Sequence, residues 1–313
     1  SVLVTGGIFT VPLDFGATAF PGAARFLEIS ARLTGAPTFT TLSPRQQITS
    51  TPYAVRSLNA SSADGTINAT TQYNLGGSRI LSAAGTNNLF AGFGAGQANT
   101  VGSNNAFFGF NAGAANAGDP NDINVGRDNA FFGAGAGQAN TYSSNAFFGA
   151  AAGQRNTTAG GNSFFGFGSG EFNINGGNNS FSGAWAGRFN TSGANNAFFG
   201  EEAGRENSTG SNNSFYGSVA GYLNRTGNNN TMVGYDANVG ANNLINATAI
   251  GAGARVDQSN SLVLGNSVNV GIGTTTPATA LEVSGNVRST RTGVAPQYIQ
   301  LNGGDSGSIK LTA

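Results

Sequence analysis

Cysteine and histidine are both absent from the 313 residues of the chain. Their absence excludes disulfides, thiolate zinc sites, imidazole metal ligands and the histidine-based relays of many hydrolases. Charge is scarce as well, since 9% of the residues are charged and 14 basic residues balance 14 acidic ones. The basic residues are scattered along the chain, so the sequence predicts neither nucleic acid nor an anionic membrane as a partner.

Long apolar runs are missing too. No stretch approaches the roughly 20 consecutive apolar residues that span a bilayer, so we expect no membrane span. The opening residues SVLVTGGIFTV have neither the basic region nor the cleavage pattern of a signal peptide, and we expect any export signal to precede Ser1. The absence of these residue types and segments together predicts a protein that is not an enzyme and that needs no cofactor.

Glycine, by contrast, occupies 50 positions, and some of these glycines recur at a fixed sequence spacing. The glycine that follows a double aromatic returns every 17 residues from Gly149 to Gly251. Upstream the pattern reaches Gly92, with one interval of 24 residues across the insertion GDPNDIN, and downstream the step to Gly265 shortens to 14. A 17-residue unit is too short for a helical hairpin or a propeller blade and fits one coil of a parallel β-solenoid.

Asparagine recurs in the same register, in a unit that reads N-x-F-F-G-x-x-A-G-x-x-N-T-x-G. Asparagine tolerates the left-handed backbone of tight turns, and stacked amides can hydrogen-bond from coil to coil. We therefore expect the first asparagine of each unit to lie at a corner of the coil. These predicted corners are Asn105, Asn129, Asn145, Asn162, Asn179, Asn196, Asn213 and Asn230.

The aromatic pair predicts more than a core, because adjacent residues of a strand point to opposite faces. One phenylalanine of each pair can fill the narrow coil against a wall of alanines. The other would form a long apolar stripe in water unless a second chain covers it, so the pattern predicts self-association. The predicted core and self-assembly residues are Phe107, Phe108, Phe131, Phe132, Phe147, Phe148, Phe164, Phe165, Phe198 and Phe199.

Three other patterns suggest ligands, and we expect each to have a structural role instead. Strings such as GFGAG lack the lysine or acidic residue of a nucleotide-binding loop. Glu201, Glu202 and Glu206 form a dense acidic group that could in principle cleave a glycosidic bond, but they replace phenylalanine, alanine or glycine of other repeats and should face solvent. Asp119, Asp122 and Asp128 near the insertion are the best candidates for calcium, yet no further ligand accompanies them in a fixed loop, so no metal site is expected.

The strings NNAFFG, AGxxN and, at 246–265, NATAIGAGARVDQSNSLVLG resemble the heads of trimeric autotransporter adhesins. This resemblance implies a left-handed parallel β-roll and a homotrimer. The 14-residue step to Gly265 matches the period of that family, whereas the 17-residue units depart from it. The predicted fold is therefore all-β, a trimeric parallel β-solenoid of 17-residue repeats over residues 74–270.

The two ends do not follow the repeat. Residues 1–58 alternate apolar and polar side chains in short runs, which predicts a small antiparallel β domain. The strings at 14–33 and 39–60 resemble a module of large exported bacterial proteins, and that resemblance implies that the domain lacks strands at its N-terminus. Residues 59–73 should be a linker, with one or two helical turns near Thr51–Arg56 before it. Residues 271–313 should form a neck and strands, since the string at 269–289 resembles the neck that precedes the self-cleaving chaperone of phage tail fibres. We expect no chaperone domain within these residues.

The sequence as a whole predicts a structural or adhesive subunit of an extracellular fibre on a bacterial surface. Its main partner would be itself, as a homotrimer, and strand addition between the C-terminal and N-terminal ends of successive trimers would extend the trimers into a filament. Surface glycans are a second expected partner. The alternative is a phage-type tail fibre that recognises surface polysaccharide.

Overall fold

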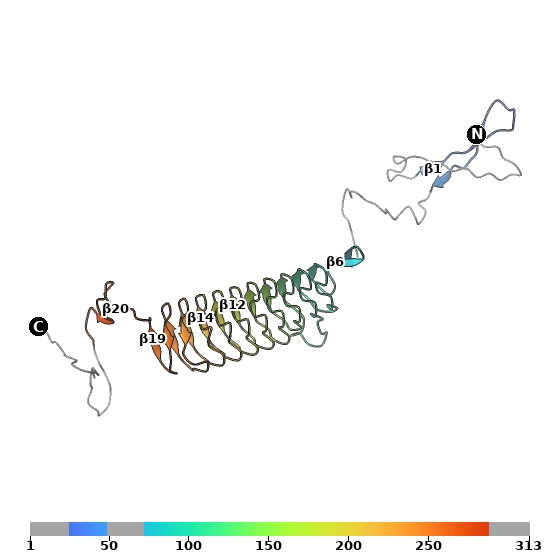
Figure 1. The fold of residues 1–313 in the computed structure, drawn as a ribbon. Helices are drawn as coiled ribbons and strands as arrows, with labels where there is room; N and C mark the ends of the chain where they lie inside the picture. The colour runs from blue at the N-terminus through green and yellow to red at the C-terminus, as the bar shows by residue number, and fades with distance from the viewer. Residues whose placement is uncertain (1–24, 49–71, 288–313) are drawn as a thin grey trace. The chain divides into compact units, whose positions relative to one another are not determined.

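The computed structural model describes residues 25–48 and 72–287, and within these ranges all regular structure is β (Figure 1). The chain divides into two compact units, Ser1–Asn68 and Ala69–Ala313. The helical turns expected near Thr51–Arg56, the two ends of the chain that are expected to take part in strand addition, and nearly all of the linker expected at 59–73 lie outside the described residues.

The described part of the first unit consists of two small antiparallel sheets. Strand β1 (Arg25–Leu27) pairs with β4 (Gln46–Ile48), and β2 (Ser30–Ala31) pairs with β3 (Thr40–Thr41). The antiparallel β structure predicted for the N-terminal region is therefore confirmed.

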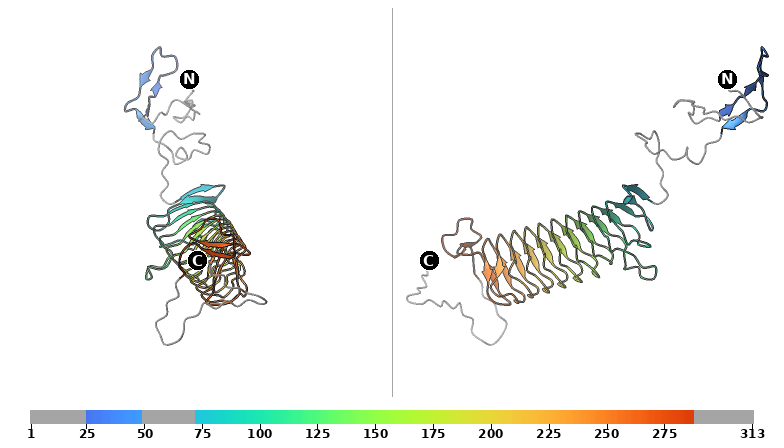
Figure 2. Two further views of the ribbon diagram at one scale, coloured as in Figure 1. Left: turned by 90° about the vertical axis from the view of Figure 1, so that its left-hand side faces the viewer. Right: turned by 45° about the vertical axis from the view of Figure 1, so that its right-hand side comes forward.

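The second unit is a solenoid whose coils each contribute one short strand to a single sheet of 13 strands (Figure 2). From β7 onward every neighbouring pair in this sheet is parallel and lies in the same register of the repeat. The predicted parallel β-solenoid with 17-residue spacing is thus confirmed. Its parallel strands are β7 (Leu89–Ala91), β8 (Ala106–Phe108), β9 (Ala130–Phe132), β10 (Ala146–Phe148), β11 (Ser163–Phe165), β12 (Ser180–Ser182), β13 (Ala197–Phe199), β14 (Ser214–Tyr216), β15 (Thr231–Val233), β17 (Thr248–Ile250) and β19 (Leu262–Leu264).

The two ends of this sheet differ. At the N-terminal end, β6 (Ser78–Ser82) pairs antiparallel with β7, and β5 (Gln72–Leu75) folds back on β6 as a hairpin. At the C-terminal end the outermost strand is β19. A second ladder of two strands, β16 (Asn238–Val239) and β18 (Arg255–Val256), lies in the last coils, and β20 (Val270–Ile272) pairs with β21 (Leu281–Val283) beyond them.

The insertion in the 24-residue interval leaves the sheet intact. Strand β8 pairs directly with β9, residue for residue, although their sequence separation is longer than one repeat. The additional residues leave and re-enter the coil through Gly118 and Gly126, which approach so closely that a Cβ on Gly126 would lie 2.5 Å from the Cα of Gly118. The insertion is therefore a loop on the side of the coil.

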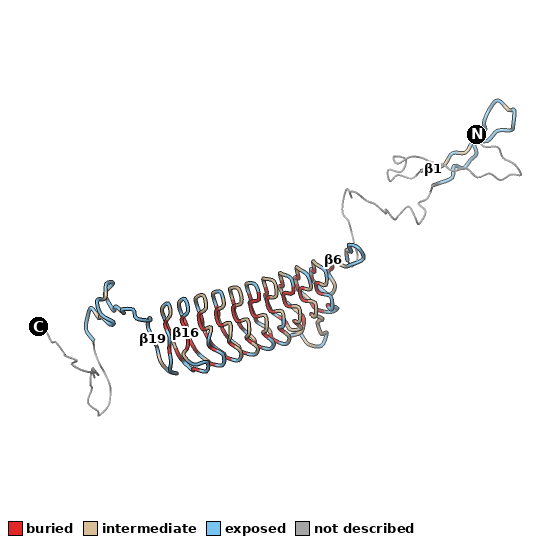
Figure 3. The backbone as a smooth tube through the Cα atoms, viewed as in Figure 1, coloured by how far each residue is buried: buried red, intermediate tan, exposed pale blue. Residues whose placement is uncertain are grey.

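The core is a single column of phenylalanines inside the coils, and buried residues recur in every coil (Figure 3). Phe181, for example, is fully buried and stacks on Phe164 and Phe198 with ring centroids 4.8 and 4.7 Å away. Opposite the rings lies a wall of buried small residues, which are Ala112, Ala136, Ala152, Ser169, Ala186, Ala203 and Ala220. The first phenylalanine of each pair is the one inside the coil, since Phe107, Phe131, Phe147, Phe164 and Phe198 are all fully buried.

Both the backbone conformation and a close contact with the next coil require glycine at the repeat position. Gly166 has φ 129°, which L side chains rarely adopt, and a Cβ there would lie 2.5 Å from the carbonyl oxygen of Gly183 in the next coil. Each coil turns so tightly after its strand that only a hydrogen fits between successive coils. The fixed spacing of this glycine in the sequence follows from that contact.

The predicted corner asparagines are buried within the coil, and each links two neighbouring coils. The backbone N–H of Asn196 donates to Asn179 Oδ1 at 2.9 Å, its Nδ2 donates to the Gly210 carbonyl at 2.8 Å, and its own Oδ1 accepts from Asn213 N–H at 2.9 Å. The backbone is left-handed one residue earlier than we expected, as at Asn195 with φ 58°. The left-handed residue can be asparagine, aspartate, serine or glycine because its side chain is exposed. The residue after it is buried and needs both an amide oxygen that accepts a hydrogen bond and an NH2 group that donates one.

A second column of asparagines forms a side-chain ladder beside the first column, and the two columns share acceptors, since Asn179 Nδ2 and Asn190 Nδ2 both donate to the Gly193 carbonyl. Asn190 Nδ2 donates to Asn173 Oδ1 at 2.6 Å and to the Gly193 carbonyl at 2.8 Å, while its Oδ1 accepts from Asn207 Nδ2 at 2.8 Å. All three of these asparagines are fully buried. Buried amides that satisfy one another in this way fix the register of the coils, since a slip of one residue would leave polar groups unpaired.

Candidate self-association surface

The second phenylalanine of each repeat points out of the coil and stacks on its counterpart in the next coil. Phe148 lies between Phe132 and Phe165, with ring centroids 4.8 and 5.0 Å away and ring planes inclined by 6° and 3°. We call this column the outer stripe. From the N-terminal to the C-terminal end it consists of Phe108, Phe132, Phe148, Phe165, Ser182, Phe199, Tyr216, Val233, Ile250 and Leu264.

Much of the outer stripe is open to solvent in the single chain. Phe165 is 45% exposed, Tyr216 43% and Phe199 38%. The residue just after the repeat glycine adds further exposed aromatic side chains in four of the coils, which are Phe93, Phe110, Phe167 and Tyr235. We call the outer stripe and this adjoining column together the strand face.

The strand face is nearly free of charge. Glu201 is the single charged residue among its two columns. Continuous apolar surface without charges is rare on monomeric proteins and typical of interfaces. The face also repeats at the spacing of the β-ladder, so its ridges and gaps recur at every coil.

One coil interrupts the outer stripe. Ser182 stands where its neighbours in the sheet carry Phe165 and Phe199, and the adjoining positions Ser180 and Ala184 are small as well. The aromatic stack is therefore divided in two, with Phe108 to Phe165 on one side of the gap and the pair Phe199 and Tyr216, stacked at 5.1 Å, on the other.

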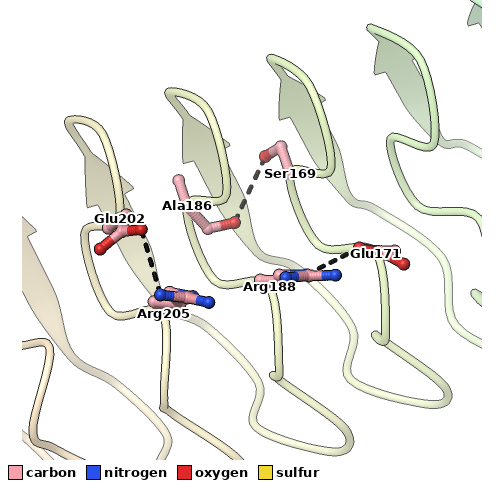
Figure 4. A network of polar contacts seen from close by, with 6 residues as sticks. All are labelled: Ser169, Glu171, Ala186, Arg188, Glu202 and Arg205. Carbon is pink, nitrogen blue, oxygen red and sulfur yellow. Dashed lines mark hydrogen bonds and ion pairs between the residues drawn. The ribbon is translucent and has the colours of Figure 1, made fainter.

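A different part of the coil, which the sequence did not single out, carries most of the solenoid's ion pairs. The fifth position after the repeat glycine holds Glu171, Arg188 and Arg205 in successive coils, and the sixth position holds Phe172, Phe189 and Glu206. Arg188 Nε donates to Glu171 Oε2 of the preceding coil at 2.7 Å, and Arg205 Nη1 donates to Glu202 Oε1 of its own coil at 3.1 Å (Figure 4). We call these two columns the polar face.

Aromatic rings of the polar face support these guanidinium groups. The Arg188 guanidinium lies 5.0 Å from the Phe189 ring centroid, and that of Arg155 lies 4.4 Å from the Phe172 ring centroid. Cation–π contacts of this kind are worth about 0.5–1 kcal/mol each at exposed sites. Glu171 and Arg188 occupy the same repeat position in neighbouring coils, whereas Arg205 pairs with a residue of its own coil.

The acidic residues near the insertion serve the backbone. Asp119 Oδ1 accepts from Asn121 N–H and Asp122 Oδ1 from Asn124 N–H, both at 2.8 Å, while Asp128 is a left-handed corner whose Oδ1 accepts from Asn104 Nδ2 at 2.9 Å. Within residues 25–48 and 72–287, no three acidic side chains come together as a metal site would require.

The acidic group at 201–206 is divided by the fold. Glu202 pairs with Arg205, and Glu206 lies 3.6 Å from Arg225 of the next coil, whereas Glu201 is exposed. The fold thus pairs Glu202 and Glu206 with different arginines and leaves Glu201 on the strand face.

In the described part of the chain, no helix is long and apolar enough to cross a bilayer. Comparison with known proteins identifies no family whose model matches this chain, and neither a curated protein nor a solved structure is significantly similar to it.

Proposed function

We propose that this chain is a structural or adhesive subunit of an extracellular fibre on a bacterial surface and that it assembles with copies of itself through the strand face. The observation that carries the proposal is the outer stripe, in which stacked aromatic rings such as Phe148 and Phe165 run along the outside of the coils. In a lone chain, water would contact each of these rings.

A second copy of the chain is the partner that fits this surface best. The strand face repeats at the spacing of the β-ladder, about 4.8 Å per coil, and another copy offers the same repeat. An ordinary globular partner would match one or two coils, whereas a second solenoid can interdigitate along the full length. The near absence of charge removes the like-charge repulsion that would otherwise oppose contact between identical faces.

Cyclic symmetry closes such an assembly without leaving an apolar face open. Identical stripes that meet around one axis bury each other completely, and the resemblance of NNAFFG and of residues 246–265 to trimeric adhesin heads favours three copies. Covering the exposed part of one outer ring contributes on the order of 1 kcal/mol. The many rings of three chains then make dissociation slow.

The two edges of the sheet support the growth of trimers into a filament. Strand β5 is one edge of the 13-stranded sheet and β19 is the other, and Leu75 of β5 and Leu262 of β19 are both exposed. Backbone groups at such edges pair readily with another strand. A head-to-tail contact of this type need not close on itself, so its repetition gives an open fibre.

Electron microscopy of native material tests the proposal. Negative-stain images of source cells, with antibodies against the solenoid, should show labelled filaments that project from the cell surface. Label confined to the cell interior would contradict the extracellular fibre, and label on the short fibres of virions would replace it with the tail-fibre alternative.

A further inference from the structure

An open depression of about 570 Å³ lies on the polar face, where three successive coils carry alanine, glutamine and arginine and no aromatic side chain. Its lining residues come from the same two repeat positions, five and six residues after the repeat glycine. They are Ala114, Ala115, Gln138, Ala139, Gln154 and Arg155. The next coils fill the same positions with Glu171 and Phe172 and with Arg188 and Phe189, so the depression ends where phenylalanine first occupies the sixth position.

The polar side chains of the depression are ordered, and some of their hydrogen-bond donors have no partner within the described part of the chain. Gln154 Nε2 donates to Gln138 Oε1 at 3.0 Å, which orders both amides. This bond leaves one N–H of Gln154 and the NH2 group of Gln138 available for a ligand. The three alanines give the depression an apolar floor.

The charge of the depression is purely positive. Arg155 is the one charged residue in its lining, and within the described residues no carboxylate forms an ion pair with it. The nearby Glu171 is neutralised by Arg188 at 2.7 Å. The Arg155 guanidinium lies 4.4 Å from the Phe172 ring centroid, so it is held in place at the border while its N–H groups stay available.

We propose that this depression binds an acidic polysaccharide. The amides of Gln138 and Gln154 bond to sugar hydroxyls, the Arg155 guanidinium pairs with a carboxylate of a uronic acid, and the alanine floor contacts the C–H faces of the sugar rings. The depression spans three coils that are about 4.8 Å apart, and this elongated shape suits a short stretch of an extended chain better than a compact ligand. Binding is weak for one short oligomer and becomes strong when many subunits of a fibre contact one polymer.

Calorimetric titration of the whole protein with two probes of equal length tests this inference. An oligogalacturonate should bind, and binding should weaken as salt is added because an ion pair contributes. A neutral cello-oligosaccharide should bind at least several-fold more weakly. Equal binding of both probes, or no binding of either, would overturn the proposal.

Two variants localise the binding. Ala139→Phe fills the depression with the side chain that Phe172 and Phe189 place at the same repeat position, so the coil accommodates it; this variant should abolish binding of both probes. Arg155→Gln should weaken the oligogalacturonate by roughly fivefold and leave the neutral probe unchanged. Unchanged binding by Ala139→Phe with unaltered circular dichroism would place any glycan site elsewhere.

A matched control uses Arg225, which is exposed and paired with Glu206 at 3.6 Å on another part of the solenoid. Arg225→Gln removes the same charge from the molecule and should leave the affinity for both probes as it was. An equal loss in Arg225→Gln and Arg155→Gln would mean that overall charge, and not the depression, attracts the oligomer. Sedimentation of each variant shows whether assembly is intact, so loss of binding and loss of assembly are distinguishable.

Discussion

Phe148 and Phe165 stack on the outside of the solenoid with ring centroids 5.0 Å apart and ring planes inclined by 3°. Their strand neighbours Phe147 and Phe164 stack at 4.8 Å in the fully buried core. One strand of three residues thus carries two parallel aromatic columns with opposite environments. The inner column stabilises the coil, and the outer column has no comparable role within one chain, which is the basis for the proposed self-association.

Replacement of outer rings should therefore impair assembly before it impairs folding. We expect the combined variant Phe148→Ser, Phe165→Ser and Phe199→Ser to give monomers or aggregates, because the interface loses apolar area while the inner column remains. Size-exclusion chromatography with light scattering measures the mass. The control Thr157→Ser, at a site away from the strand face, should have no effect, and an unchanged mass of the triple variant would contradict the proposed interface.

Filling the gap in the outer stripe should have the opposite effect. In Ser182→Phe the new ring would stack between Phe165 and Phe199, and a stacked pair is worth about 0.5–1.5 kcal/mol beyond its buried area. The thermal midpoint of the assembly should rise. Thr209→Phe adds the same ring at an exposed site away from the strand face and serves as the control; a lower midpoint for Ser182→Phe than for this control would show that the gap is needed.

The side-chain ladder of asparagines should tolerate no loss of a donor. Asn190→Asp removes the Nδ2 that donates to Asn173 Oδ1 and to the Gly193 carbonyl, and it places a carboxylate in a fully buried site. We expect the free energy of unfolding to fall by about 2–5 kcal/mol, as measured by denaturant titration. Asn178→Asp changes an exposed left-handed residue and should be nearly neutral. Equal effects of the two variants would refute the ladder.

Substitution of the repeat glycine should also destabilise the solenoid, in this case for a steric reason. Gly166→Ala places a Cβ 2.5 Å from the Gly183 carbonyl oxygen on a backbone with φ 129°, so the coil spacing has to change. We expect a loss of about 2 kcal/mol or more, again by denaturant titration. Gly177 has an ordinary φ and its nearest neighbour atom would be 3.2 Å from a Cβ, so Gly177→Ala should cost clearly less. A small effect of Gly166→Ala would contradict the close approach of the coils.

Much of the solenoid could be predicted because its period is visible residue by residue. The 17-residue spacing of glycine indicated the coil, and the alternation in strands separated Phe147 from Phe148. The position of the left-handed residue could not be predicted, since Asn195 and Asn196 have the same side chain and differ only in backbone conformation and burial.

The polar face and its depression could not be predicted either. The partnership of Glu171 with Arg188 depends on the rotation of each side chain around the coil. The depression at Ala139 exists because alanines of two neighbouring coils coincide beside Gln154 and Arg155 of a third. Such features emerge from the relative placement of coils and not from the composition of one repeat.

Sedimentation velocity and equilibrium of the unmodified protein test the central claim most directly, because the chain has a mass of 31.4 kDa and a trimer therefore sediments as a clearly larger species. The account predicts a trimer, or polymers of trimers, that does not dissociate on dilution. A stable, soluble monomer with the strand face open to water would contradict it.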